Sequence, residues 1–312
     1  MNAIEVNRLT RRFGAFVAVK DLSFDVRQGE IFGFLGSNGA GKSTTIRMLC
    51  GLLRPSSGSA RVGGVDVGSN PEGVKQRIGY MSQRFSLYEK LTVDQNITFF
   101  GGIYGLGRER LAARRASVLD MAGLRGREAT LTGALSGGWR QRLGLGCAIL
   151  HEPPIVFLDE PTGGVDPLSR RRFWRLIDEL AKNGTTVLVT THYLDEAEHC
   201  HRIAIIHAGQ LAALGTVAEL KQIFTGRPIF EVRAPRPVEA MRRLEEMPEV
   251  EKTSIFGTSV HAVMRSAGAS PGASPDAIAA RLQAAGIPAQ CSVVEPSLED
   301  VFLDIAEGAA RQ

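Results

Sequence analysis

Several features that define other protein classes are scarce in this sequence. Only four of the 312 residues are cysteines, and Cys50, Cys147, Cys200 and Cys291 form no CxxC pair. Such isolated cysteines are typical of a reducing compartment such as the cytosol. No uncharged stretch reaches the ~18 apolar residues that a membrane span needs. The longest of them, Ile203–Ala218, is interrupted by polar residues, so no membrane span is expected.

Periodic repeats and extreme charge are also missing. The 35 glycines and 14 prolines follow no period, which excludes a collagen-like chain. A composition of 44% hydrophobic and 22% charged residues argues against disorder and is sufficient for a large core. The net charge of +4 is no nucleic-acid signature. Arg8, Arg11 and Arg12 interrupt the polar start of the chain, so no secretory signal is expected.

The charge is distributed unevenly along the chain. Residues 1–223 contain 28 Lys and Arg against 21 Asp and Glu, whereas residues 224–312 contain 9 against 12. A change of sign, together with a length suited to about two domains, predicts one domain over 1–223 and a second over 224–312.

The first domain has the pattern of an α/β protein. Short apolar runs are separated by turn residues and helix-like segments, which is typical of parallel strands buried on both faces. The beginning of the chain alternates between apolar and polar residues instead and predicts antiparallel strands. The runs are Ile31–Leu35, Ile155–Leu158, Thr186–Thr190 and Ile203–His207, the alternating segments are Ala3–Leu9 and Leu22–Val26, and the helices include Arg110–Ala122 and Ser169–Lys182.

The second domain is predicted to be a small α+β unit. Its elements follow the order βαββαβ with one added helix, which is the order of a ferredoxin-like fold. The predicted strands are Ile229–Arg233, Val250–Phe256, Ser259–Met264 and Gln290–Val294, and the predicted helices are Val238–Met247, Pro275–Ala285 and Ser297–Ala306.

A glycine-rich segment follows the first apolar run. It fits the pattern G-x-x-x-x-G-K-[ST], lies after the strand Ile31–Leu35 and precedes the helix-like Thr44–Cys50. Backbone N–H groups of such a loop surround phosphate, the lysine reaches the β- and γ-phosphates, and the serine hydroxyl is a ligand for Mg²⁺. The residues expected to bind nucleotide are Gly36, Ser37, Asn38, Gly39, Ala40, Gly41, Lys42, Ser43 and Thr44.

Two carboxylates end the second apolar run. Asp159 is suited to the shell of Mg²⁺, and Glu160 is suited to polarising an attacking water. On the residues alone, an ordinary acidic turn after a strand is the alternative. The presence of the glycine-rich loop earlier in the chain favours the functional interpretation, because open α/β sheets bind ligands at the carboxyl ends of their strands.

A second candidate anion site lies between these two motifs. The segment Leu135–Gln141 has the sequence Leu-Ser-Gly-Gly-Trp-Arg-Gln, in which Ser136 is a good helix N-cap. With this third motif, the region Ile4–Lys221 closely resembles the nucleotide-binding subunit of ATP-binding-cassette (ABC) transporters. The resemblance implies a P-loop NTPase fold that comprises a mixed-sheet core, an antiparallel β subdomain and an α-helical subdomain.

The resemblance also implies roles for individual residues. Phe13 corresponds to the aromatic that stacks on adenine, and Gln83 to the glutamine that approaches Mg²⁺ and the attacking water. His192 corresponds to the histidine that contacts the γ-phosphate. ATP and Mg²⁺ are the implied ligands, with Ser43, Gln83 and Asp159 near the metal. The residues implied to meet the ATP of a second subunit, or to signal to that subunit, are Ser136, Gly137, Gly138, Gln141 and Asp166.

The segment Leu87–Asn96 and the tail Glu295–Phe302 resemble those of ABC-2-type export ATPases. The resemblance therefore implies a dimer of cassettes, most simply a homodimer, and a separate ABC-2-type transmembrane permease. It further implies a peripheral position on the cytoplasmic face of the inner membrane, with ATP hydrolysis driving export of an unspecified cargo. Two alternatives stay open: a soluble ABC-type ATPase that acts on ribosomes or nucleic acid, and a nucleotide-responsive binding module with little turnover.

Overall fold

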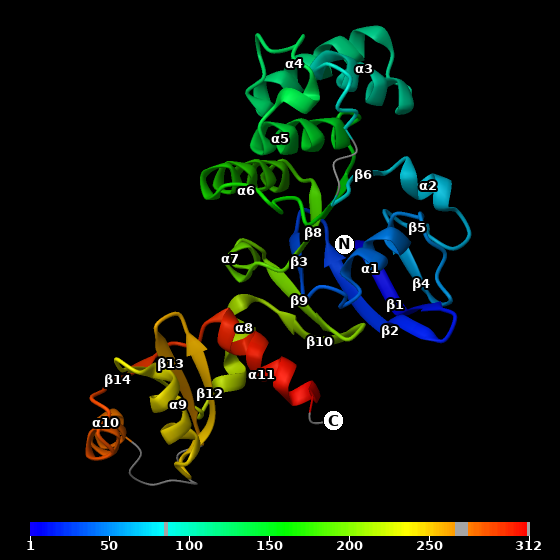
Figure 1. The fold of residues 1–312 in the computed structure, drawn as a ribbon. Coiled ribbons are helices and arrows are strands. Elements are labelled where there is room, and N and C mark those ends of the chain that lie inside the picture. Colours follow the sequence, from blue (N-terminus) through cyan, green and yellow to red (C-terminus); the bar gives the residue numbers. More distant parts are fainter. Residues whose placement is uncertain (84–86, 266–273, 311–312) are drawn as a thin grey trace. The chain divides into compact units, whose positions relative to one another are not determined.

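The computed structural model describes residues 1–83, 87–265 and 274–310 (Figure 1). The chain divides into two compact units, Met1–Val217 and Ala218–Gln312. The short helices α8 (Val217–Lys221) and η2 (Gln222–Phe224) occupy the region around residue 224, where the net charge changes sign.

A six-stranded sheet forms the centre of the first unit, in the order β10-β9-β3-β8-β7-β6. The five strands from β9 to β6 are parallel to their neighbours, and β10 pairs with β9 in the antiparallel direction, so the predicted mixed sheet is confirmed. All residues of β3, β7 and β8 are buried, because helices or a second sheet cover both faces. The strands are β3 (Ile31–Leu35), β6 (Ile78–Met81), β7 (Ile155–Asp159), β8 (Thr186–Thr191), β9 (Arg202–His207) and β10 (Gln210–Gly215).

An antiparallel sheet of four strands, β2-β1-β4-β5, packs beside the central sheet. The predicted antiparallel pair is confirmed, but both strands are longer than the alternating segments suggested, since bulges let the pairing continue through polar residues. The strands are β1 (Asn2–Phe13), β2 (Phe16–Arg27), β4 (Ser57–Val62) and β5 (Val65–Asp66).

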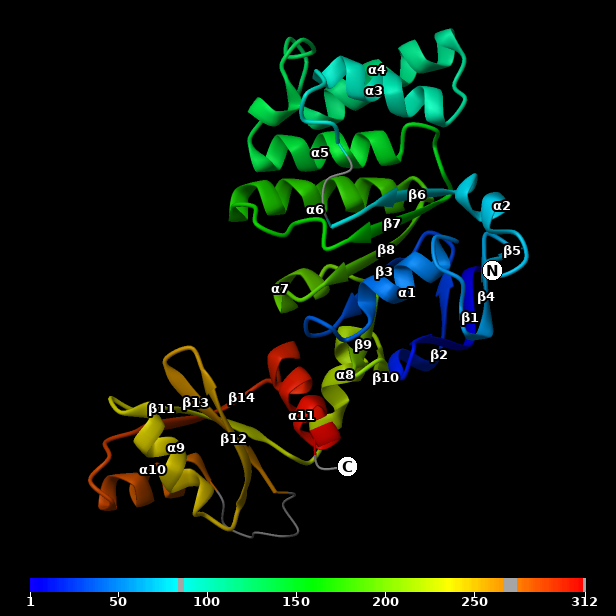
Figure 2. The ribbon, with the colours of Figure 1, turned by 45° about the vertical axis from the view of Figure 1, so that its right-hand side comes forward.

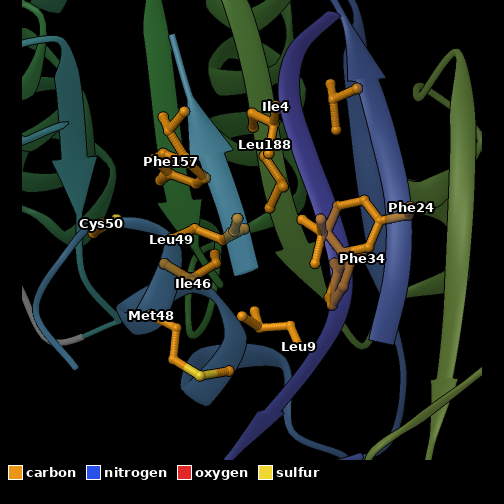
Figure 3. Packing of buried hydrophobic residues seen from close by; sticks show 14 of the residues in the cluster. Ile4, Leu9, Phe24, Phe34, Ile46, Met48, Leu49, Cys50, Phe157 and Leu188 are labelled. Carbon is orange, nitrogen blue, oxygen red and sulfur yellow. The ribbon is translucent and has the colours of Figure 1, made fainter. Parts of the chain in front are cut away.

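A large apolar core lies between these two sheets around the helix α1 (Lys42–Leu49). Figure 3 shows Ile46 and Leu49 of α1 near Phe157, with Phe24 and Phe34 packed together across the core. The Phe24 and Phe34 ring centroids are 5.2 Å apart. Each buried side chain of this size contributes about 1.5–3 kcal/mol, so the core fixes the start of α1 against the ends of the central strands.

A helical subdomain projects from the central sheet, and its helices have a core of their own. In Figure 2, α5 and α6 run side by side. A Cβ atom at Gly138 would lie only 2.4 Å from Ser169 Oγ, so this close approach requires glycine. The other helices of the unit are α2 (Pro71–Lys75), α3 (Val93–Ile103), α4 (Arg108–Ala122), the 3₁₀ helix η1 (Thr132–Ala134), α5 (Gly137–Ala148), α6 (Pro167–Lys182) and α7 (Leu194–Ala197).

The second unit is built on a four-stranded antiparallel sheet in the order β12-β13-β11-β14. One face packs against α9 and α10 through an apolar core. The helix α11 is held by a buried pair, in which His261 Nδ1 lies 2.8 Å from Asp300 Oδ1. The elements are β11 (Ile229–Arg233), α9 (Pro237–Glu245), β12 (Val250–Phe256), β13 (Ser259–Met264), α10 (Pro275–Ala284), β14 (Gln290–Val294) and α11 (Leu298–Ala310).

Within the part of the chain that the structure describes, no helix combines the length and apolar character needed to cross a bilayer.

Each unit has a core of its own, so removal of residues 224–312 should leave a folded first unit. Circular dichroism should show retained helix content and one cooperative thermal transition. A truncated chain that remains unfolded or insoluble would contradict the domain boundary.

Candidate functional site

The glycine-rich loop lies at the carboxyl end of β3, between that strand and α1. Two of its glycines are required by close backbone contacts. A Cβ atom at Gly36 would lie 2.5 Å from the carbonyl oxygen of Ile206, and one at Gly41 would lie 2.7 Å from that of Ala18. Gly41 also has a φ of 103°, which L side chains rarely adopt. The loop is therefore shaped by the strands around it.

Lys42 opens α1 and is almost completely buried, with 4% of its surface exposed. Its Nζ donates hydrogen bonds to the carbonyl oxygens of Gly36 at 2.8 Å and Ser37 at 3.2 Å. The same atom lies 3.3 Å from Glu160 Oε1. The ammonium is thus held beneath the loop, where it supplies positive charge to the space that the loop encloses.

Asp159 ends β7 and joins three elements. Its Oδ1 accepts hydrogen bonds from Ser43 Oγ at 2.9 Å and from Thr190 Oγ1 at 2.8 Å. Burial raises the pKa of Asp159 above its usual range, and the two hydroxyl donors counteract part of that rise. The serine hydroxyl and the carboxylate that the sequence assigned to one metal site are therefore in direct contact.

Glu160 follows in a left-handed backbone conformation, with a φ of 47°. This conformation is uncommon for a residue other than glycine, and the Glu160 N–H donates to Thr190 Oγ1 at 2.8 Å. The turn directs the carboxylate towards two further predicted residues. Gln83 Nε2 donates to Glu160 Oε2 at 2.9 Å, and His192 Nδ1 lies 3.3 Å from the same oxygen. The carboxylate therefore contacts Lys42, Gln83 and His192 together.

A cleft of about 430 Å³ opens above this cluster. Phe13 and Phe16 are part of its lining, and both rings are substantially exposed, at 46% and 63%. The Arg11 guanidinium lies 4.6 Å from the centroid of the Phe13 ring. The other lining residues are Ala18, Asn38, Gly39, Gly41, Lys42, Ser43, Thr44, Gln83 and Glu160. A lining that combines exposed aromatic rings with the glycine-rich loop suits a nucleotide.

The serine–glycine turn of residues 135–138 does not line this cleft. Ser136 is exposed at the N-cap position of α5, and its side chain makes no capping hydrogen bond. Gly137 is half-buried, whereas Gly138 is buried against Ser169 of the same chain. The hydroxyl of Ser136 therefore remains available to an outside group.

Gln141 and Asp166 have placements that the sequence did not indicate. Gln141 is only 1% exposed, and its amide makes no hydrogen bond within the described residues. Its side chain is therefore packed inside its own subunit, and the expected contact with the ATP of a second subunit stays a prediction. Asp166 is exposed and caps α6 by accepting a hydrogen bond from Ser169 N at 2.9 Å.

Two site residues escaped the sequence analysis. Phe16 pairs with Phe13 across the β1–β2 turn, and the short hairpin was the available signal. Thr190 is completely buried, and its hydroxyl bridges Asp159 and Glu160. A threonine at the end of an apolar strand does not indicate this role in the sequence. No group of three or more His, Cys, Asp or Glu side chains arranged to hold a metal occurs over residues 1–83, 87–265 and 274–310.

A larger cavity of about 700 Å³ lies at the opposite, amino ends of β7 and β8. Its lining includes Arg61, Arg77 and Thr186 and none of the motif residues. The chemistry of the motifs therefore favours the smaller cleft as the functional site.

Comparison with known proteins gives consistent results. The sequence profile of the family described as "ABC transporter" matches residues 19–163, and an AAA-domain profile matches residues 134–194. The chain is 50% identical over 218 residues to "Probable multidrug ABC transporter ATP-binding protein YbhF" of Escherichia coli (strain K12), a match that covers 70% of this chain. The matched region spans only 38% of the length of that relative.

A second relative matches over nearly the full length of both chains. It is "Nod factor export ATP-binding protein I" of Burkholderia pseudomallei (strain 1710b), which is 36% identical over 302 residues, or 96% of this chain and 95% of the relative.

Solved structures of ABC transporter cassettes also match this chain over about the length of the first unit. "Structure of ATP binding subunit of ABC transporter" has a TM-score of 0.66 and 32% identity and covers 72% of this chain and 93% of its own. "Dimeric Structure of MJ0796, a Bacterial ABC Transporter Cassette" has a TM-score of 0.63 and 25% identity and covers 68% of this chain and 98% of its own.

The bridging position of Thr190 generates a stability prediction. Thr190→Val keeps the shape of the side chain but leaves Asp159 and the Glu160 N–H each without one partner. The free energy of unfolding should fall by about 1–3 kcal/mol, as measured by denaturant unfolding. Thr190→Ser retains the hydroxyl and should stay close to the parent; an equally stable valine variant would show that the bridge is unimportant.

Proposed function

Because this chain belongs to the ATP-binding subunits of ABC transporters of the ABC-2 export type, we propose that it binds ATP in the cleft beside Phe13 and hydrolyses it. One observation carries this proposal: Lys42, Gln83 and His192 converge on the carboxylate of Glu160. A base, a cation and two polar side chains then surround the position where a terminal phosphate would meet water.

The loop and Lys42 bind the phosphates, and the Phe13 ring provides a surface on which adenine stacks. Glu160 accepts a proton from the attacking water, whose oxygen bonds to the γ-phosphorus while the bond to the ADP oxygen breaks. His192 and Gln83 orient the reacting groups. This assignment is supported by the distances of about 3 Å between Glu160 and its neighbours.

The residues present fit Mg²⁺. This ion takes oxygen ligands and is commonly held by one or two protein side chains together with substrate phosphates. Ser43 Oγ and Asp159 Oδ1 lie 2.9 Å apart beside the phosphate loop, and these two groups would hold the ion, with Gln83 near it. When bound, Mg²⁺ neutralises charge that develops on the phosphate oxygens.

A single chain supplies half of each complete site. The proposed partner is a second copy that approaches head-to-tail, so that Ser136, Gly137 and the start of α5 meet the ATP held by the opposite loop. Two features support this proposal: the hydroxyl of Ser136 is exposed and does not cap its own helix, and a related cassette structure is described as dimeric. Asp166 and its neighbours lie on an exposed turn suited to contact between copies.

A separate ABC-2-type permease would hold this chain at the cytoplasmic face of the membrane and couple hydrolysis to export. Exposed apolar side chains on and beside α3 support such a contact, namely Tyr88, Phe99 and Ile103. One relative is named for multidrug transport and the other for Nod factor export, so the cargo of this chain is not specified by them.

The second unit is proposed to be a ferredoxin-like accessory domain. Its element order βαββαβ and the position of its first strand beside its fourth in an antiparallel sheet support this assignment.

Glu160→Gln should leave ATP binding intact and reduce hydrolysis by roughly 10²–10⁴-fold, since the amide accepts no proton. Phosphate release measures turnover, and light scattering should show a stable ATP-dependent dimer. Glu179→Gln, at an exposed position of α6, is the matched control. Undiminished hydrolysis by the Glu160 variant would refute the assigned role.

A further inference from the structure

Glu196 is the most deeply buried acidic side chain near the site that the proposed mechanism does not use. It lies on α7, four positions after His192, and only 1% of its surface is exposed. It does not line the nucleotide cleft. A buried carboxylate is costly unless it is paired and hydrogen-bonded, so its partners indicate what it does.

Both carboxylate oxygens of Glu196 are engaged, and the partners come from three different segments. Oε1 accepts a hydrogen bond from Thr162 Oγ1. Oε2 accepts one from Thr191 Oγ1 at 2.7 Å. Arg170 Nε lies 3.2 Å from Oε1 as an ion pair without an aligned hydrogen bond. The charge of Glu196 is therefore compensated, and the side chain is fixed from several directions.

Two of the three partners stand close in sequence to catalytic residues of the proposed site. Thr162 lies two positions after Glu160, and Thr191 immediately precedes His192. The Thr191 hydroxyl also accepts a hydrogen bond from Tyr193 N at 2.9 Å, so it binds both sides of the turn that carries His192. Glu196 thus links the segment after β7, which carries Glu160, to the segment after β8, which carries His192. In these segments, His192 Nδ1 lies 3.3 Å from Glu160 Oε2.

The third partner extends the network to the loop of residues 163–166. Arg170 lies on α6, one helical turn after its N-cap Asp166, and its N–H donates to the Asp166 carbonyl oxygen at 3.0 Å. The Arg170 guanidinium covers the Tyr193 ring at 4.2 Å from the centroid, and its Nη1 lies 3.4 Å from Asp195 Oδ2. The start of α6 is therefore connected to the turn that follows β8.

We propose that Glu196 is a positioning residue that sets the placement of Glu160 relative to His192 and, through Arg170, ties both to the start of α6. This inference rests on the proposed ATPase function. Because Glu196 does not line the cleft, its effect should fall on turnover and leave nucleotide binding unaffected.

The direct test is Glu196→Gln in the full chain. The amide has nearly the same shape but lacks the charge and can accept at only one of its two ends. The kcat of ATP hydrolysis should fall on the order of 10²-fold, as expected when reacting groups are slightly misplaced. The affinity for a fluorescent ATP analogue should change less than about twofold. Glu198→Gln, at an exposed position two residues along, should retain the parental kcat.

Two variants of Thr191 test the same link in case Glu196→Gln does not fold. Thr191→Val removes the hydroxyl and should lower kcat, whereas Thr191→Ser keeps it and should restore most of the turnover. The double variant that combines Glu196→Gln with Thr191→Val should have a kcat close to that of the more impaired single variant. Both changes break the same link, so their effects should not add.

The outcomes separate this inference from the proposed function. If the parent hydrolyses ATP and Glu196→Gln has a parental kcat, or if the two changes are additive, the positioning role is overturned. The role is likewise overturned if Glu196→Gln weakens nucleotide binding as strongly as it lowers kcat. A parent chain without any ATP hydrolysis would overturn the proposed function and this inference together.

Discussion

The contact between Lys42 and Glu160 is the interaction on which the site depends. These residues come from distant parts of the chain, and the 3.3 Å between Lys42 Nζ and Glu160 Oε1 requires β3 and β7 to end at the same edge of the sheet. The left-handed conformation of Glu160 completes the geometry by directing its carboxylate at the loop. Such strain persists only where the surroundings hold it, and the Thr190 hydroxyl supplies that restraint.

The same geometry explains why one chain is proposed to be incomplete. Its cleft supplies positive charge from one side only, through Lys42 and the loop. The exposed hydroxyl of Ser136 belongs to α5 and is not part of that cleft. A second copy would bring this hydroxyl and the N–H groups of α5 to the open side, so that ATP itself holds the two molecules together.

Contiguous patterns in the sequence predicted most of the fold and part of the site. The bounds of β3, β11, β12, β13 and β14 match the expected ones, because apolar runs bounded by turn residues are local signals. The choice of Gln83 and His192 as site residues came from family resemblance alone, and their contacts with Glu160 are seen only in the structure. Three features had no local signal: the positive φ of Glu160, the Thr190 bridge and the burial of Gln141, each of which depends on the packing of separate segments.

The central claim, that a lysine-bearing loop and a serine–glycine turn from opposite molecules build one site, is tested most directly by mixing two inactive variants. Lys42→Ala disables the loop, and Ser136→Arg blocks the turn. A mixed dimer of the two retains one intact composite site. The account predicts that the mixture hydrolyses ATP although neither variant does so alone. A mixture no more active than its separate components would contradict it.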